Sequence, residues 1–202
     1  GVIITINKRI PIAGGMAGGS SDCATTMIGI NQMFNLGLDK KALMDRGVKL
    51  GADVPYCILG GTAIARGIGE VLTPLKTPPQ CHVIIAKPPV SVSTAFVYGH
   101  IRPNQIKKHP DVEKMVEAIN NQDLKMLAGL LSNVMEEVTI PEYPIIQDIK
   151  EVMLENGALN SIMSGSGPTV FGLYDDKESA EKTVELLKEK QLTEQVYLTK
   201  FI

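Results

Sequence analysis

Residues 11–21, with the sequence PIAGGMAGGSS, combine residue types that suit the binding of a phosphate group. Paired glycines let the backbone adopt left-handed conformations and approach a ligand closely. Successive backbone N–H groups can then converge on an anion, and the start of a following helix adds free donors and a positive dipole end. The hydroxyls of Ser20 and Ser21 can bind phosphate or help to hold Mg²⁺. We therefore predict that this first glycine loop (residues 11–21) binds phosphate.

The first glycine loop does not match the common nucleotide-binding patterns. A Walker A loop requires a lysine after its last glycine, and residues 11–21 contain no lysine. The segment GGMAGG does not supply the dinucleotide fingerprint GxGxxG. The HRD and DFG motifs that accompany the glycine loop of protein kinases are absent from the chain. A flexible turn without a ligand remains the structural alternative.

A second glycine loop, SGSGP, occupies residues 164–168 between two segments with strand character. Alone, this pattern is equally compatible with a tight turn and with a binding loop. Two glycine loops in one chain favour a protein that handles phosphate groups.

The composition of the chain limits its classes of function. The net charge of -2 argues against a broad electrostatic footprint for nucleic acid or membrane surfaces. No apolar run approaches the roughly 20 residues needed to span a bilayer, and no signal-peptide pattern is present. The cysteines form no CxxC pair and the histidines have no ligand-type spacing, which indicates a reducing compartment and no structural zinc. We expect a cytoplasmic protein that binds neither nucleic acid nor membrane, and we assign no residue as a metal ligand.

Hydrophobic periodicity predicts the elements that must position the two loops. The β-branched residues at 2–7 predict a strand, and the apolar spacing at 21–35 predicts a helix capped by Ser20 or Ser21. The first half of the chain is completed by a helix at 39–50 capped by Asp39, a sharp turn entering a strand at 51–61, and a hairpin at 61–75.

The proline-containing segment 73–80 is the predicted domain boundary. Beyond it the pattern predicts strands at 81–88, 159–163, 169–174 and 194–202, and helices at 94–100, 111–120, 123–136, 144–156 and 177–190. This order of elements favours an α+β sandwich with an antiparallel sheet.

Several segments resemble motifs of the GHMP kinase superfamily, in the same order and over essentially the whole chain. PIAGGMAGGSSDCAT is similar to the second motif of that superfamily, and SGSGPTVFGL is similar to the third. The segments GADVPYCILGGTAIARG and KPPVSVSTAFVY are most similar to the branch that serves the non-mevalonate isoprenoid pathway. The resemblance implies an α+β fold of two domains: the remainder of an N-terminal α/β domain at 1–79, and a ferredoxin-like C-terminal α+β domain at 80–202.

The resemblance also implies a reaction, the transfer of the γ-phosphoryl group of ATP to the 2-hydroxyl of a cytidine-diphosphate sugar alcohol. Asp53, in GADVP, would accept the proton because a sugar hydroxyl is a poor nucleophile. A plain turn residue is the alternative for Asp53. ATP, arriving with Mg²⁺, would bind to the whole first glycine loop: Pro11, Ile12, Ala13, Gly14, Gly15, Met16, Ala17, Gly18, Gly19, Ser20 and Ser21.

On the substrate side, Gly165, Ser166 and Gly167 would brace the first glycine loop or close on the phosphates. Tyr98 matches the position whose ring stacks on the cytosine base, and Thr94 lies one helical turn earlier on the same face. Simple packing is the alternative role for Tyr98. The implied partners are small molecules, ATP and the sugar alcohol, and a homodimer is left open.

In this superfamily a lysine from a K-x-N-L motif partners the aspartate, and a G-Y-H motif follows it; neither occurs in the chain. The chain also begins without Met, inside a strand-like pattern. We therefore expect that an N-terminal piece is missing, and with it half of the catalytic pair; whether this fragment is active alone is left open. Two other interpretations stay open: a sister GHMP kinase acting on mevalonate, homoserine or a galactose-type substrate, and a non-catalytic nucleotide-binding module.

Overall fold

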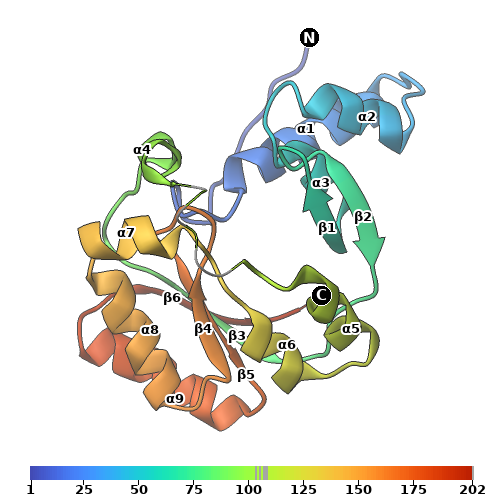
Figure 1. Cartoon of the computed structure of the whole chain (residues 1–202). Coiled ribbons are helices and arrows are strands. Elements are labelled where there is room, and N and C mark those ends of the chain that lie inside the picture. Colours follow the sequence, from blue (N-terminus) through green and yellow to red (C-terminus); the bar gives the residue numbers. More distant parts are fainter. Residues whose placement is uncertain (103, 105, 107–108, 202) are drawn as a thin grey trace. The chain divides into compact units, whose positions relative to one another are not determined.

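The computed structural model describes residues 1–102, 104, 106 and 109–201, and the chain divides into two compact units (Figure 1). Unit 1 comprises Gly1–Ile12 and Ala17–Lys76. Unit 2 comprises Ala13–Met16 and the chain from Thr77 onward. The main division between the units therefore lies within the proline-containing segment 73–80. No helix in the described part of the chain is both long and apolar enough to cross a membrane.

Unit 1 is built from short helices and a hairpin. Its elements are the helices α1 (Gly18–Met33), α2 (Lys40–Gly47) and α3 (Val54–Leu59) and the strands β1 (Thr62–Arg66) and β2 (Val71–Leu75). The helices share a small core of Ala24, Leu43, Val54 and Ile58. Asp39 caps α2 as predicted, because its carboxylate accepts a hydrogen bond from the Ala42 amide at 2.7 Å. β1 and β2 pair antiparallel, which confirms the predicted hairpin.

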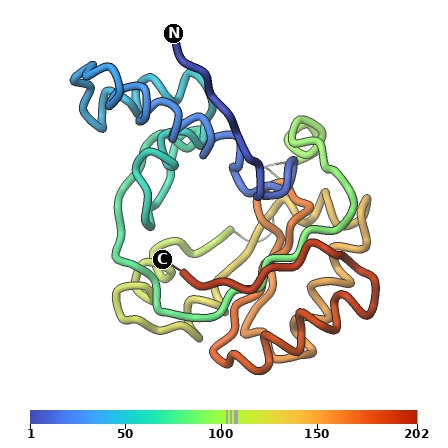
Figure 2. The backbone as a smooth tube through the Cα atoms, turned by 180° about the vertical axis from the view of Figure 1, so that it is seen from behind, coloured from blue at the N-terminus to red at the C-terminus, as the bar shows by residue number. Residues whose placement is uncertain are grey.

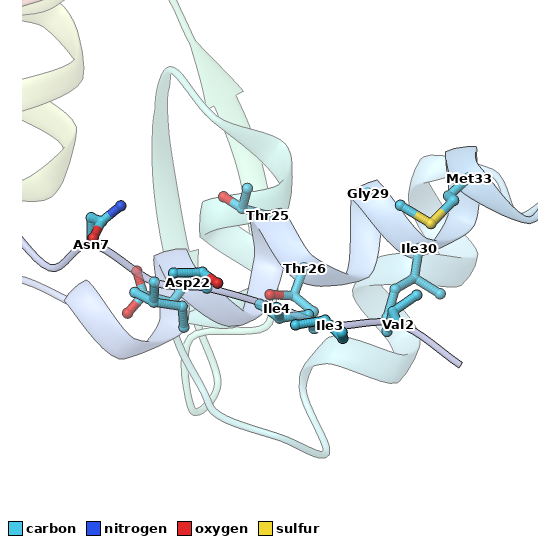
Figure 3. Close-up of a pocket in the computed structure, with 12 residues that line it drawn as sticks. Val2, Ile3, Ile4, Asn7, Asp22, Thr25, Thr26, Gly29, Ile30 and Met33 are labelled. Atoms are coloured by element: carbon cyan, nitrogen blue, oxygen red, sulfur yellow. The ribbon is translucent and has the colours of Figure 1, made fainter.

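The predicted strand at 2–7 is wrong for the described residues. The segment forms no ladder, and a strand is stable only when its N–H and C=O groups pair with a neighbour. The segment instead runs along α1, with Ile3, Ile4 and Val2 beside Thr26 and Ile30 (Figure 3).

Two further predictions in unit 1 are wrong. Helix α1 begins at Gly18 and its N-cap is Ala17, rather than Ser20 or Ser21. Residues 54–59 form the helix α3 rather than entering a strand. Proline is well accommodated in the first turn of a helix, and Pro55 occupies such a position. Burial of Val54, Pro55 and Ile58 then favours the helix over the extended form that this short apolar run also allows.

Unit 2 contains a four-stranded sheet with the order β4-β5-β3-β6, in which all neighbours are antiparallel. The strands are β3 (His82–Lys87), β4 (Asn160–Met163), β5 (Val170–Tyr174) and β6 (Gln195–Lys200). Figure 2 shows the last strand, β6, running beside β3, the first strand of this sheet. With a helical crossover before β4 and another after β5, this is the ferredoxin-like arrangement predicted for the second half of the chain.

Helices cover both faces of this sheet, and the alternation along β3 explains how. Ile84 and Ala86 pack with residues of α8 and α9, whereas Val83 and Ile85 belong to the cluster that contains Ala128 of α6. The helices of unit 2 are α4 (Thr94–His100), α5 (Val112–Asn120), α6 (Leu124–Leu130), α7 (Glu136–Glu142), α8 (Ile145–Glu155) and α9 (Lys177–Glu189).

Most elements predicted for the second half are confirmed, with one exception. The helix predicted at 123–136 ends at Leu130, because the backbone is extended at Leu131. Glu136–Glu142 form the separate helix α7, which was not predicted. The side chain of Asn133 also accepts a hydrogen bond from the Met135 amide, as caps and turns do. Of the strand predicted at 194–202, Ile202 lies outside the described residues.

Candidate active site

The backbone of the first glycine loop has the alternating positive φ angles of an anion-binding nest, and residues 13–17 are called the nest below. Positive φ angles occur at every second residue, with 53° at Ala13, 70° at Gly15 and 50° at Ala17. Alternation between right- and left-handed conformations turns successive N–H groups toward one side, where they can converge on an anion. Ala13 and Ala17 adopt a conformation that costs a non-glycine residue free energy. Strain of this kind is typical of ligand-binding loops.

Helix α1 begins directly at the end of this nest. The Ser21 amide donates to the Ala17 carbonyl at 2.9 Å, which is the first helical hydrogen bond. The amides of Gly18, Gly19 and Ser20 precede it and have no partner within the helix, and no side chain caps this end. Three free donors and the positive end of the helix dipole therefore follow the nest.

A lysine that the spacing did not single out also lies at the start of α1. Lys8 forms an ion pair with Asp22 in the first turns of the helix. Its Nζ atom lies 3.1 Å from the position that a Cβ would take on Gly18. The carboxylate of Asp22 therefore neutralises the charge of this lysine.

The second glycine loop packs against residues 13–16 within unit 2. Ser164 Oγ donates to the Gly15 carbonyl at 2.8 Å. A Cβ on Gly15 would lie 2.4 Å from the Ser164 carbonyl oxygen, and one on Gly165 would lie 3.4 Å from the Gly15 carbonyl oxygen. Because the two backbones are in direct contact, only glycine fits at position 15.

The acceptor-side residues predicted from the sequence lie on α4 and on the second glycine loop. The hydroxyls of Thr94 and Ser166 form a hydrogen bond of 2.9 Å. Ser93 caps α4 by accepting from the Phe96 amide at 3.3 Å. The Tyr98 side chain, one turn after Thr94, is 62% exposed. The ring of Tyr98 is therefore not buried in the core of unit 2.

Asp53 lies in unit 1, at the residue before α3. It is exposed, and its carboxylate caps no amide of the helix. A Cβ on Gly51, two residues earlier, would lie 3.7 Å from Ser20 Oγ, so the chain before Asp53 runs beside the first turn of α1. Burial raises the pKa of the Cys57 thiol, and the negative charge of Asp53 one turn earlier raises it further.

A groove of about 400 Å³ lies between residues 2–7 and α1 (Figure 3). None of the site residues predicted from the sequence lines it. Across the described residues, no three His, Cys, Asp or Glu side chains gather in a way that could hold a metal ion.

Comparisons with known proteins place these features in a family. Residues 1–61 match the family described as GHMP kinases N terminal domain, and residues 115–191 match GHMP kinases C terminal. A 4-diphosphocytidyl-2-C-methyl-D-erythritol kinase of Lachnoclostridium phytofermentans is 53% identical over 201 residues, which cover 100% of this chain and 69% of that protein. The chain belongs to the 4-diphosphocytidyl-2-C-methyl-D-erythritol kinase family of GHMP kinases.

Other members of the 4-diphosphocytidyl-2-C-methyl-D-erythritol kinase family agree. The enzyme of Lachnospira eligens is 50% identical, covering 98% of this chain and 69% of its own length. A crystal structure of 4-(cytidine 5'-diphospho)-2C-methyl-D-erythritol kinase superimposes with a TM-score of 0.78 and 30% identity, covering 96% of this chain and 68% of that one. The GHMP-kinase fold class predicted from the sequence is confirmed.

The predicted residues thus form local groups. In unit 2 the structure brings Gly15 together with the second glycine loop, and Ser166 with Thr94. In unit 1 it brings Ser20 beside the chain that leads to Asp53. Lys8, Asn133 and Glu136, which contact these loops, were missed, because no residue spacing links them to the loops that they contact.

Proposed function

We propose that this chain carries the nucleotide and acceptor residues of an ATP-dependent kinase that phosphorylates the 2-hydroxyl of 4-diphosphocytidyl-2-C-methyl-D-erythritol, an intermediate of isoprenoid biosynthesis. The observation that carries the proposal is the high identity to enzymes of that name, 53% and 50% over nearly the whole chain. The local geometry supports each part of the proposed reaction.

The first glycine loop binds the phosphates of ATP in this proposal. The alternating positive φ angles from Ala13 to Ala17 and the free amides at the start of α1 support the assignment. Each of these segments offers backbone N–H donors that can bind a phosphate. Such donors stabilise the charge that spreads over the transferred phosphoryl group without reorganising during the reaction.

Asp53 is the base that accepts the proton of the attacking hydroxyl. Its exposure and the absence of a capping hydrogen bond support this role, because the carboxylate oxygens remain available to an acceptor molecule. Proximity of Gly51 to Ser20 Oγ supports it further, because it brings the Asp53 segment next to the helix start that would hold phosphate. A carboxylate so placed removes the proton as the phosphoryl group moves in line.

The acceptor binds through α4 and the second glycine loop. The exposed ring of Tyr98 offers an apolar face for the cytosine base, and Thr94 lies one turn away on the same side of α4. The hydrogen bond between Thr94 and Ser166 connects this helix to the loop that contacts Gly15. The second glycine loop therefore connects α4 with Gly15 of the first glycine loop.

Mg²⁺ fits the donor set of the first glycine loop. The hydroxyls of Ser20 and Ser21 are hard oxygen ligands in the first turn of α1, and Mg²⁺ usually keeps several waters and phosphate oxygens besides one or two protein ligands. When bound with ATP, the ion would neutralise charge on the phosphates.

The test is a coupled assay on the full-length protein that contains this chain, with ATP and each of three alcohols. We expect turnover of 4-diphosphocytidyl-2-C-methyl-D-erythritol and no turnover of homoserine or mevalonate. Turnover of homoserine or mevalonate, with none of the cytidine substrate, would reject the proposal in favour of a sister GHMP kinase. Binding of ATP without turnover of any alcohol would favour a non-catalytic nucleotide-binding module.

A further inference from the structure

Asn133, in the turn between α6 and α7, holds the second glycine loop by side-chain hydrogen bonds. Its Nδ2 donates to the Met163 carbonyl at 2.8 Å and to the Gly165 carbonyl at 2.7 Å. Its Oδ1 accepts from the Met135 amide at 2.9 Å. Both N–H groups and the oxygen of the side-chain amide are therefore used, which fixes its orientation.

Glu136, at the start of α7, holds the same place by a second contact. Its Oε1 accepts from the Met163 amide at 2.7 Å. Its other carboxylate oxygen forms an ion pair with Lys150 of α8, and the two side chains are only 18% and 13% exposed. The N–H and the C=O of Met163 are thus both bound by side chains from outside the sheet, Glu136 and Asn133.

The second glycine loop lies between these contacts and the first glycine loop. Ser164, the residue after Met163, donates through its hydroxyl to the Gly15 carbonyl. Gly15 leaves no room for a Cβ against the Ser164 carbonyl, so a displacement of Ser164 must move residues 13–16 or open the contact. Thr139 of α7 adds a further hydrogen bond to the loop at the Ser166 carbonyl, at 3.3 Å.

We propose that Asn133 and Glu136 are positioning residues for nucleotide binding. They fix the backbone of Met163 and Gly165, the second glycine loop then fixes Gly15, and Gly15 sets the shape of the nest. This inference rests on the proposed role of the first glycine loop as the ATP phosphate site. Neither side chain touches the nucleotide; both act through the loop.

The test uses Asn133→Asp in the full-length protein. The carboxylate keeps the acceptor for the Met135 amide, but it removes both donors and turns a negative oxygen toward two carbonyls. The matched control is Asn160→Asp, because Asn160 Nδ2 also donates to a carbonyl, that of Ala128 at 2.6 Å, from the other end of β4. ATP binding is measured by calorimetry, and amide exchange of residues 163–167 by mass spectrometry.

We expect Asn133→Asp to weaken ATP binding at least about 10-fold and to speed exchange in residues 163–167, because small displacements of a binding loop are costly. We expect Asn160→Asp to leave ATP affinity unchanged while it lowers stability. Wild-type ATP affinity in folded Asn133→Asp would overturn the inference, as would an equal loss in the control. If Asn133→Asp does not fold, Glu136→Ala takes its place, because it removes the acceptor of the Met163 amide. A several-fold loss of ATP affinity is the expected result, and no loss is the refutation.

The two proposals fail in different ways. If the wild-type protein binds ATP but phosphorylates no alcohol, the proposed reaction is wrong and the affinity test of Asn133 is unaffected. If the wild-type protein binds no ATP, the role of the first glycine loop is wrong, and the inference that Asn133 positions a nucleotide site falls with it. In either case, an unchanged rate of amide exchange in residues 163–167 of Asn133→Asp would show that Asn133 does not hold the second glycine loop in place.

Discussion

Gly15→Ala tests the contact between the two glycine loops. The new Cβ would lie 2.4 Å from the Ser164 carbonyl oxygen and 3.0 Å from the Gly167 carbonyl oxygen, so the backbone must shift. Gly15 also has a φ of +70°, and the left-handed conformation costs a residue with a Cβ about 1–2 kcal/mol. Overpacking adds about 1–3 kcal/mol. We expect the free energy of unfolding to fall by about 2–5 kcal/mol.

The matched control is Gly37→Ala, at a glycine with a φ of +67° and nothing within 4 Å of its Cβ position. Gly37→Ala should lower the free energy of unfolding only by the cost of the left-handed conformation, about 1–2 kcal/mol. Urea unfolding followed by circular dichroism gives both values, and the KM for ATP gives the functional effect. We expect a higher KM for ATP in Gly15→Ala and an unchanged KM in Gly37→Ala. Equal losses of stability in the two variants would refute the argument that the loops are in contact.

Three further predictions concern single side chains. Asp53→Asn should keep ATP affinity in calorimetry but lower kcat about 100- to 10,000-fold, and a near-normal kcat would remove Asp53 from the role of base. Tyr98→Ala should raise the KM for the cytidine substrate and leave the KM for ATP unchanged in steady-state assays; the reverse pattern would contradict the stacking role. Hydrogen bonds from Ser179 hold the pKa of Asp176 below the ordinary aspartate value of 3.8. The ionised carboxylate of Asp176 therefore stabilises the fold fully at pH values above 3.8, and this stabilisation is lost as the pH falls through the lowered pKa. The stability difference between the wild type and Asp176→Asn, from urea unfolding at several pH values, should therefore shrink with acidification, and a constant difference would contradict the argument.

The sheet of unit 2 could be predicted from the sequence because its strands have strong local signals. His82–Lys87 is a β-branched run bounded by prolines, and Val170–Tyr174 follows a cluster of glycine and serine. Such signals depend on neighbours in the chain rather than on distant packing. The amphipathic pattern of the helix Lys177–Glu189 is equally local, and this helix was also predicted.

Failures of prediction occurred where distant contacts decide the conformation. The segment 2–7 has the pattern of a strand, but a strand requires a pairing neighbour that its own sequence cannot specify. The run VPYCIL has too few residues to separate a helix from a strand by period, and packing of Val54 and Ile58 in the unit 1 core decides for α3.

In the candidate site, too, residues with a local sequence signal were predicted and residues that act through distant contacts were not. Glycine density identified both loops, because a backbone that must approach another group closely requires glycine nearby. The amide of Asn133 lies 30 residues from Met163 in sequence, and nothing in its spacing links it to that strand. Side chains that hold a loop through its carbonyls have no motif of their own, because any donor of the right reach can serve.

The most direct test of the account is the identity of the product. The full-length protein is incubated with ATP and 4-diphosphocytidyl-2-C-methyl-D-erythritol, and the product is examined by ³¹P NMR and mass spectrometry. The account predicts one added phosphoryl group, present as a monoester on the 2-hydroxyl of the methylerythritol unit, with ADP formed in equal amount. ADP formation without a phosphorylated acceptor, or a phosphate on any other hydroxyl, would contradict it.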